Sequence, residues 1–389
     1  MVTRRPISLL KSKDSIAETW PDEPARFTDA HVDPFILWCV KRNSSDITLQ
    51  TDRPIYNEIY GTLYPGLFRP IDAADMAVFL HKIYGPDATA RLASGTDLDL
   101  SYEVRPDRYT RVRFRVNITP VLSRGRDSAQ ITMRVLPNEP PTMKDLNIED
   151  EIIRSWQPRQ GMVIITGPTG SGKTTLLAAG IRMLMERKRG AGKIVCYEAP
   201  IEYVYDAIKS PRSLISQTEI PRHLPDFARG VRNALRRKPN IILVGEARDR
   251  ETIAAAIEAS QTGHTVYTTT HTVGVAATIQ RMVATFDPNE RSERAYALME
   301  TVRLIVTQTL VPRVNGGRVG VREWMRFSDD VRDKFLGMDF KLWPAEIQRI
   351  IQFNGRTMAT SAGILFDKGQ IDRRTYIMLS SSTGAGGGD

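Results

Sequence analysis

The sequence predicts an α/β protein with two folded parts, a small α+β domain followed by a larger domain built on a parallel sheet. Three observations lead to this prediction. At 389 residues the chain exceeds the size at which a single core usually remains undivided. The adjacent prolines Pro140 and Pro141 interrupt regular structure. After them, short apolar runs alternate with helical stretches, as in parallel strands joined by helices.

The composition is typical of a folded cytoplasmic chain. Charged residues make up 25% of the sequence and hydrophobic residues 41%, which argues against extensive disorder. No apolar run approaches the roughly 20 residues of a membrane span, and the N-terminus lacks the apolar stretch of a secretory signal, so we expect no transmembrane segment. Cys39 and Cys196 are too few for a disulfide framework or a zinc site. The net charge of +9 admits nucleic acid or an anionic membrane as a partner, but a solvated basic surface explains it equally well.

The first domain is predicted over residues 27–136, after a loosely held arm at residues 1–26. Helices are expected around 31–42 and over 73–84, and the alternating run 46–50 predicts a strand. This mixture of elements indicates a small α+β domain.

A second alternating run, Arg111–Val116, indicates a strand with two different faces. Its period of two places Arg111, Arg113 and Arg115 on one face and three apolar residues on the other. The strand is therefore predicted to have a core face and a cationic strip. Residues 137–149, which contain the prolines, are predicted to link the two domains.

The second domain is predicted over residues 150–379. Its strand-like runs are 162–166, 193–198, 241–244 and 265–270. After Phe327 the pattern changes to short helices. The Gly/Ser-rich end, residues 380–389, is predicted to be a flexible tail.

The sequence Gly167–Thr174 (GPTGSGKT) matches the phosphate-binding pattern G-x-x-x-x-G-K-[ST] at every position. It follows a strand-like run and precedes a helical one, which is the order that the motif requires. Its backbone N–H groups would surround ATP phosphates, Lys173 would contact the β- and γ-phosphates, and the Thr174 hydroxyl would bind Mg²⁺. The candidate nucleotide-binding residues are Gly167, Pro168, Thr169, Gly170, Ser171, Gly172, Lys173, Thr174 and Thr175.

Hydrolysis also requires a carboxylate that orients water, and two later segments offer one. Glu198 ends a predicted strand, and Glu202 follows it after Pro200. Glu246 follows the apolar strand 241–244 and Gly245, in the layout of a Walker B motif that has glycine where aspartate is usual. The carboxyl ends of parallel strands are where such sheets bind ligands, although any of these acids could instead be an ordinary surface residue.

A further strand-like run, 265–270, is bracketed by His264 and His271. A histidine near the γ-phosphate can donate a hydrogen bond to it, whereas a structural role is the alternative. No third ligand has the spacing of a metal site.

Taken in order, these motifs resemble the Walker A, Asp-box, Walker B and His-box motifs of the secretion ATPases related to PilT and GspE. The residues concerned are 167–175, 197–204, 245–249 and 262–272. Within that family the run 216–225 and the chain length resemble the DotB/TraJ-type ATPases of type IVB secretion and IncI-type conjugation systems. Residues 112–117 and 133–137 resemble the end of the family's PAS-like N-terminal domain.

The resemblance implies a RecA-like ATPase domain behind the PAS-like domain, and a homohexamer that docks on inner-membrane or cytoplasmic components of a secretion apparatus. Glu202 would be the catalytic carboxylate, Glu246 would support Mg²⁺ or the water, and both His264 and His271 would sense phosphate. Arginines of the first domain are candidates to reach a nucleotide, namely Arg113, Arg115, Arg124 and Arg134.

The chain also departs from parts of this family. Ala199 stands where pilus retraction motors usually carry an acid, and Thr270 replaces the usual leucine before His271. The tetracysteine module of many GspE-type proteins cannot form from two cysteines. These departures disfavour type II secretion.

Three other functions remain open. A pilus retraction motor is one. A second is a nucleic-acid motor, whose basic helix would carry Arg229, Arg232, Arg236 and Arg237. Phe227, Val231 and Leu235 predict a buried stripe on that helix, so its arginines could equally form a subunit contact. A third is a scaffold that binds ATP without turning it over.

Overall fold

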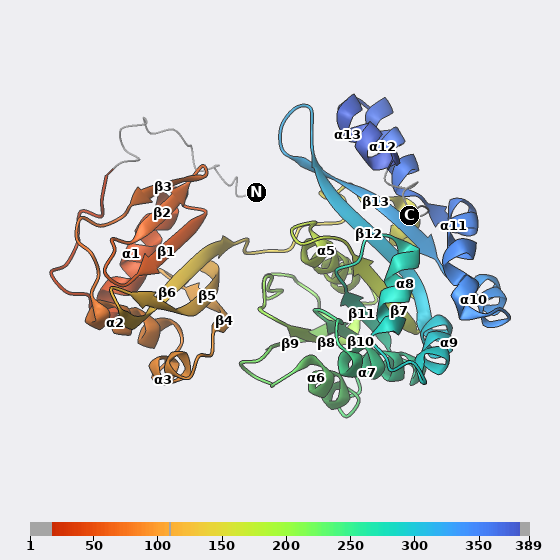
Figure 1. Ribbon diagram of the computed structural model, residues 1–389, viewed down its shortest axis with the longest axis horizontal. Helices are drawn as coiled ribbons and strands as arrows, with labels where there is room; N and C mark the ends of the chain where they lie inside the picture. The colour runs from red at the N-terminus through yellow and green to blue at the C-terminus, as the bar shows by residue number, and fades with distance from the viewer. Residues whose placement is uncertain (1–17, 109, 382–389) are drawn as a thin grey trace. The chain divides into compact units, whose positions relative to one another are not determined.

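This computed structural model describes residues 18–108 and 110–381, and the chain divides into two compact units (Figure 1). Of the described residues, those up to Asn138 together with Pro200–Glu202 form the first unit, and the others form the second. None of the helices formed by the described residues is long and apolar enough to cross a bilayer. Most of the predicted arm, residues 1–17, and most of the predicted tail, residues 382–389, lie outside the described residues.

The first unit is built on an antiparallel sheet with the strand order β3-β2-β1-β6-β5-β4. Its strands are β1 Asp46–Gln50, β2 Tyr56–Ile59, β3 Thr62–Pro65, β4 Leu98–Val104, β5 Val112–Ser123 and β6 Arg126–Leu136. Its helices are α1 Asp29–Lys41, α2 Ala73–Ile83 and α3 Ala88–Ala93. The two helices and the strand predicted over 31–42, 73–84 and 46–50 are confirmed to within two residues.

Apolar side chains of α1 and α2 cover one face of this sheet and form its core. Phe35 and Phe79 from the helices and Phe114 from β5 are fully buried in one cluster. Trp20 belongs to the same cluster, with its ring 5.3 Å from that of Phe35. The backbone N–H of Trp20 donates to the carbonyl of Gly66. The core therefore includes a residue of the segment that was predicted to be a loose arm, because the large indole ring is buried among other aromatic rings.

The predicted cationic strip on β5 is paired with acids of the neighbouring strand. In the β4–β5 register Glu103 lies opposite Arg113. The Glu103 carboxylate is 3.7 Å from the guanidinium of Arg111 and 3.8 Å from that of Arg113, and Arg115 lies 3.1 Å from Asp99. The strip is therefore a row of mixed charge, which a reading of β5 alone could not show.

The second unit is built on a largely parallel sheet, whose strand order over the described residues is β14-β13-β12-β7-β11-β10-β8-β9. Strands β12, β7, β11, β10, β8 and β9 run parallel, and β13 and β14 add antiparallel strands at one edge. The strands are β7 Gly161–Thr166, β8 Gly192–Glu198, β9 Ser213–Glu219, β10 Ile241–Val244, β11 Thr265–Thr269, β12 Val302–Pro312, β13 Arg318–Arg326 and β14 Gly355–Arg356. All four predicted strand runs are confirmed.

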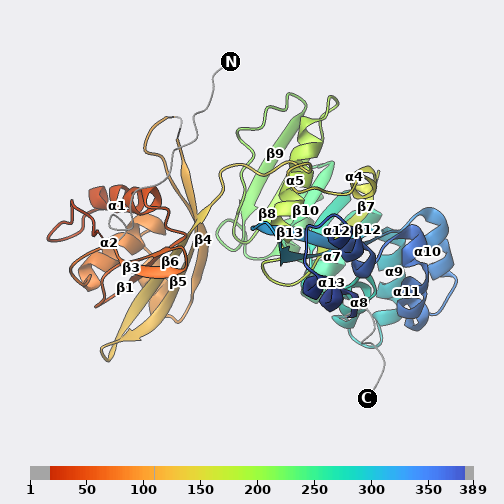
Figure 2. The ribbon, with the colours of Figure 1, turned by 90° about the horizontal axis from the view of Figure 1, so that it is seen from above.

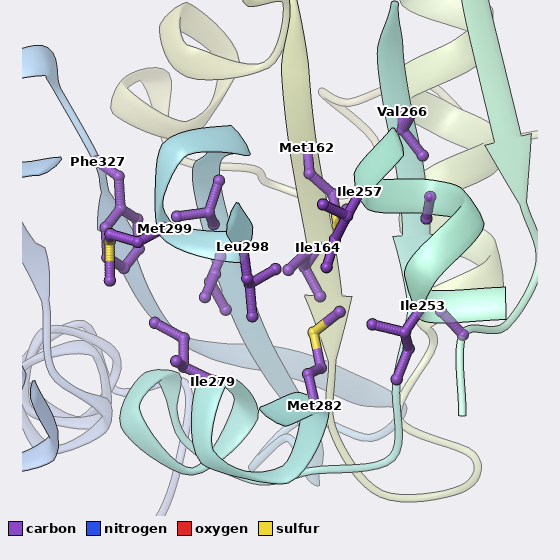
Figure 3. Close-up of a cluster of buried hydrophobic side chains, with 14 of the residues drawn as sticks. Met162, Ile164, Ile253, Ile257, Val266, Ile279, Met282, Leu298, Met299 and Phe327 are labelled. Atoms are coloured by element: carbon purple, nitrogen blue, oxygen red, sulfur yellow. The ribbon is translucent and has the colours of Figure 1, made fainter. Parts of the chain in front are cut away.

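Helices cover both faces of this sheet, which gives an α/β architecture with two apolar layers. They are α4 Asp150–Ser155, α5 Lys173–Glu186, α6 Phe227–Ala234, α7 Arg250–Gln261, α8 Val275–Ala284 and α9 Arg291–Thr301. Figure 2 shows α5 on one side of β10 and α7 on the other. Side chains of α7, α8 and α9 meet Met162 and Ile164 of β7 in the first layer (Figure 3), and α4 and α5 form the second with Val163 and Ile165. Strands buried on both faces are expected to be continuously apolar, as β7 and β10 are.

Short helices follow Phe327, as predicted. They are α10 Asp329–Leu336, the 3-10 helix η2 Phe340–Leu342, α11 Trp343–Asn354, α12 Met358–Asp367 and α13 Arg373–Ser381. The helix α13 includes Ser380 and Ser381, which were predicted to belong to the tail.

Gly180 gives a test of packing in the second unit. A Cβ atom at Gly180 would lie 2.1 Å from the ring of the fully buried Trp156. Alanine normally stabilises a helix interior relative to glycine, but here the methyl group would collide with a rigid ring. We expect Gly180→Ala to lower the free energy of unfolding by about 1–3 kcal/mol, measured by denaturant unfolding.

Gly363 provides the matched control, because it also lies inside a helix, α12. A Cβ atom there would meet its nearest neighbour, Tyr376, at 3.8 Å, which is an ordinary contact. Gly363→Ala should therefore be neutral or stabilising. Equal effects of the two substitutions would contradict the packing described for Trp156.

Candidate nucleotide site

The predicted phosphate loop lies between the end of β7 and the start of α5, which confirms the expected order of strand, loop and helix. Gly167, Gly170 and Gly172 have φ values of 139°, 76° and 82°, in the region that favours glycine. A Cβ atom at Gly167 would also lie 2.1 Å from the carbonyl oxygen of Gln308. Only a glycine allows the loop to pass this close to β12.

The loop presents donors that fit a phosphate group. Lys173 is buried, and its ammonium group donates to the carbonyl oxygens of Gly167 at 2.8 Å and Pro168 at 3.0 Å. The buried hydroxyl of Ser171 has no protein hydrogen-bond partner among the described residues. Buried polar atoms are rarely left unpaired, and the N-terminus of α5 attracts anions. A bound phosphate would supply the missing acceptor.

Two predicted site residues meet the lysine of the loop. The Nδ1 atom of His271 is 3.5 Å from the Nζ atom of Lys173, and its Nε2 atom is 3.3 Å from Oε1 of Glu246. The end of β10 is held in place because the Gly245 N–H donates to Tyr197 O at 2.7 Å and the Thr269 hydroxyl donates to Gly245 O at 2.6 Å. Lys173, His271 and Glu246 therefore form a chain of polar contacts at the carboxyl ends of three parallel strands.

Thr270, the residue that departs from the family pattern, is part of a hydroxyl network beside this chain. Its buried hydroxyl donates to Thr166 Oγ1 at 3.1 Å and lies 3.0 Å from the hydroxyl of Thr272. Thr272 in turn lies 2.7 Å from the hydroxyl of Thr278. A leucine could not make these contacts, so in this chain hydrogen bonds connect β7 to the segment that carries His271.

His264 lies at the other end of β11, so the structure does not bring it together with Lys173, Glu246 and His271. Thr265 pairs with Gly161 at the start of β7, whereas the phosphate loop follows the end of β7. One strand length, about 20 Å, separates the two positions. The His264 ring lies 3.1 Å from the carbonyl of Ala259 near the end of α7 and therefore has a structural contact.

The acids after β8 have different surroundings. Glu198 is buried at the end of the strand and accepts a hydrogen bond from the side chain of Gln217 at 2.9 Å. Glu202 belongs to the segment grouped with the first unit. In that unit Arg113 donates to the carbonyl of Glu202 at 2.7 Å, and Arg115 lies 3.6 Å from its carboxylate.

The other two candidate arginines lie elsewhere on the first sheet. Arg124 is exposed in the turn between β5 and β6, where its φ is 46°. Arg134 makes an ion pair with Asp46 at 2.8 Å. The structure therefore places Arg113 and Arg115 beside Glu202 and does not group Arg124 or Arg134 with them.

The residues predicted to bind Mg²⁺ fit that ion when it arrives with a nucleotide. Thr174 lies in the first turn of α5, next to the loop, and the neighbouring Thr175 hydroxyl is 3.1 Å from that of Tyr203. Within residues 18–108 and 110–381, no group of three His, Cys, Asp or Glu side chains could hold a metal by itself. Mg²⁺ commonly binds through one or two protein oxygens together with substrate phosphates and water, and the Thr174 hydroxyl and the Glu246 carboxylate are oxygen donors of that kind.

Gln308 and Arg322 belong to the site and were not predicted from the sequence. The Gln308 side chain donates to the carbonyl of Ser171 at 2.7 Å, and Arg322 donates to the side chain of Gln308. The only sequence signal is that three consecutive polar residues, Thr307–Thr309, interrupt the otherwise apolar run Leu304–Val311. That signal identifies no partner.

These motifs and their placement agree with a known family. The model of that family, described as type II/IV secretion system protein, matches residues 33–334. The chain belongs to this family. Its RecA-like ATPase domain, behind a smaller α+β domain, is the fold that structures of such secretion ATPases share.

Three members of the type II/IV secretion family illustrate the similarity. The structure of the ATPase DotB of Legionella pneumophila is 46% identical, with a TM-score of 0.89 over 93% of this chain and 98% of that one. A structure of the pilus retraction motor PilT with bound ADP is 28% identical, with a TM-score of 0.78 over 90% of this chain and 96% of that one. The type IV pilus retraction ATPase PilT of Pseudomonas aeruginosa is 32% identical over 77% of this chain and 83% of that protein.

Proposed function

We propose that this family member hydrolyses ATP to ADP and phosphate and, as a homohexamer, couples that reaction to substrate transfer by a type IVB secretion or conjugation system. The observation that supports the reaction most is the contact chain of Lys173, His271 and Glu246 at a complete phosphate loop. The similarity to DotB over almost the whole chain favours the type IVB system over the alternatives.

In this mechanism the loop binds ATP through its backbone N–H groups, and Lys173 exchanges its carbonyl partners for phosphate oxygens. Bound Mg²⁺ would neutralise charge on the phosphates, with Thr174 as a ligand and Glu246 supporting it. Glu202 orients the attacking water and accepts its proton. Because His271 lies between Lys173 and Glu246, its ring transmits the movement of Lys173 onto or off the γ-phosphate to Glu246.

The proposed setting is the cytoplasmic face of the inner membrane, where the ring docks on components of the secretion apparatus. Of the four candidate arginines we propose Arg113 and Arg115 as those that bind nucleotide, since both contact Glu202, the proposed catalytic carboxylate. The related alternative is a pilus retraction motor, and the similarity to PilT supports it.

The two histidines of the motif give a paired test of this mechanism. His271→Asn removes the side chain between Lys173 and Glu246, and we expect kcat to fall about ten- to a hundredfold, the usual effect of losing a hydrogen bond to a charged group. The KM for ATP should change much less. Steady-state phosphate release measures both constants.

His264→Asn is the control, because His264 lies at the opposite end of β11. It should keep kcat within about twofold, since the contacts of that ring in the described part of the chain are with Ala259 and Thr262 at the end of α7. Equal losses in the two variants would contradict the placement of His271 in the site.

One observation favours testing a nucleic-acid motor as a second function. Arg229 and Arg232 are exposed on α6, and Arg236 is exposed just after it, while Val231 is buried. Arg237, which was predicted to join them, instead donates to Ser216 at 2.5 Å and is half-buried. If these arginines bind phosphates, DNA affinity should fall steeply with salt, and Arg232→Gln should reduce the slope by about one.

A further inference from the structure

Gln308 and Arg322 form a buried polar pair behind the phosphate loop. They lie directly opposite each other on the antiparallel strands β12 and β13. Each residue is only 3% exposed. A charged side chain is costly to bury unless its donors find partners, so the contacts of this pair indicate why it is there.

The Gln308 amide has a fixed orientation. A guanidinium group can only donate, so the Gln308 atom that faces Arg322 Nε at 2.7 Å must be the oxygen. The amide nitrogen then faces the other way and donates to the carbonyl oxygen of Ser171 at 2.7 Å. Arg322 therefore ensures that Gln308 presents a donor to the phosphate loop.

This hydrogen bond determines the direction of a peptide group in the loop. The C=O of Ser171 and the N–H of Gly172 belong to one planar trans peptide, so they point in opposite directions. Because Gln308 holds the carbonyl toward β12, the Gly172 N–H points away from the hairpin. Backbone N–H groups are what such loops offer to phosphate.

The other end of the Arg322 side chain reaches the segment before α4. Its Nη1 atom donates to the carbonyl of Asn147 at 3.3 Å and lies 3.1 Å from the carboxylate of Glu149. Its Nη2 atom donates to the carbonyl of Leu146 at 3.1 Å. This segment, 146–149, is the end of the predicted interdomain linker. One guanidinium thus contacts both the linker and the side chain that orients the loop.

We propose that Gln308 and Arg322 are positioning residues that orient the Ser171–Gly172 peptide for phosphate binding and couple occupancy of the loop to segment 146–149. The inference rests on the proposed function only in requiring that the loop binds nucleotide. When phosphate binds the Gly172 N–H, it stabilises the peptide orientation that Gln308 also favours. Because Gln308 also accepts from Arg322, a more firmly held Gln308 makes the contacts of Arg322 with the carbonyls of Leu146 and Asn147 more persistent.

Gln308→Glu separates positioning from folding. The glutamate keeps an acceptor for Arg322 but cannot donate to Ser171 O, and its charge repels that carbonyl. We expect the variant to retain its melting temperature and to bind the fluorescent nucleotide mant-ADP, with Mg²⁺, about tenfold more weakly than wild type. Its amide exchange in segment 146–149 should no longer respond to ADP.

Arg182→Ala is the matched control for the linker contact. Arg182 donates to the carbonyl of Pro140 at 2.6 Å, so it also contacts the predicted linker, but from α5 and not through Gln308. This variant should bind mant-ADP as wild type does and keep the response of segment 146–149 to ADP. A general loosening of the linker would affect both variants alike.

Wild-type protein provides a test that needs no substitution. Hydrogen exchange at the amides of segment 146–149 should slow when ADP and Mg²⁺ are added. If wild type binds mant-ADP but this segment does not respond, or if Gln308→Glu binds as tightly as wild type, the inference is overturned and the proposed function stands. If wild type binds no nucleotide, the proposed function and this inference fail together.

Discussion

Glu202→Gln is expected to bind ATP with wild-type affinity and to hydrolyse it at least about a hundredfold more slowly, the usual loss when a general base is removed. Glutamine has nearly the shape of glutamate, but its amide cannot accept the proton of the attacking water. Binding depends on the phosphate loop, which this substitution does not touch. Phosphate release and mant-ATP binding, measured on the same preparation, give the two quantities.

Glu186→Gln controls for the loss of one negative charge. Glu186 lies at the end of α5 and makes an ion pair with Arg182 at 2.8 Å. Both side chains are partly exposed, so this ion pair contributes little to the stability of the fold. This variant should turn over like wild type. Normal hydrolysis by Glu202→Gln would assign the water-orienting role elsewhere, and Glu246→Gln would then be the variant to measure.

Lys173→Met should lose nucleotide binding, with an affinity about a hundredfold or more below wild type, because a charge-assisted hydrogen bond to phosphate is removed from a buried position. Methionine fills the space of the lysine stem without its charge. The loop carbonyls of Gly167 and Pro168 also lose their donor, so the empty loop is less ordered in this variant. Fluorescence titration with mant-ADP measures the affinity.

Lys193→Met provides the comparison for this substitution. Lys193 lies on β8 and, like Lys173, donates its ammonium hydrogen bond to a backbone carbonyl, that of Arg237 at 2.8 Å. Lys193→Met should therefore show what the loss of such a hydrogen bond costs in folding stability, and its affinity for mant-ADP should stay at the wild-type value. Similar mant-ADP affinities for the two variants would mean that the loop does not bind nucleotide through Lys173.

The sequence was sufficient to predict features that depend on neighbouring residues in the chain. The glycines and lysine of the phosphate loop are fixed by local geometry, and the buried strands β7 and β10 appear as short apolar runs. Glu246 could be placed at the site because it directly follows β10, and carboxyl ends of parallel strands converge.

Features that depend on pairing between distant segments were not predicted. The arginines of β5 read as a cationic strip because Asp99 and Glu103 belong to another strand, and only the β4–β5 register brings them together. His264 and His271 looked equivalent around one strand, although a strand separates its two ends by its full length.

Gln308 and Arg322 likewise could not be predicted, because their contacts in the site depend on pairing between distant segments. They meet because β12 and β13 form a hairpin, and they reach Ser171 because β12 lies beside β7. Nothing within a few residues of Gln308 indicates a partner more than a hundred residues away in the chain. Trp20 is similar, since its burial depends on contacts with Phe27 and Phe35.

The most direct test of the proposed function is phosphate release from Mg²⁺·ATP by the purified chain, followed across size-exclusion fractions whose mass is measured by light scattering. We predict that hydrolysis coincides with a species of six chains and disappears when Mg²⁺ is chelated. A chain that stays monomeric with ATP and Mg²⁺, and whose fractions release no phosphate, would contradict both the ATPase and the ring.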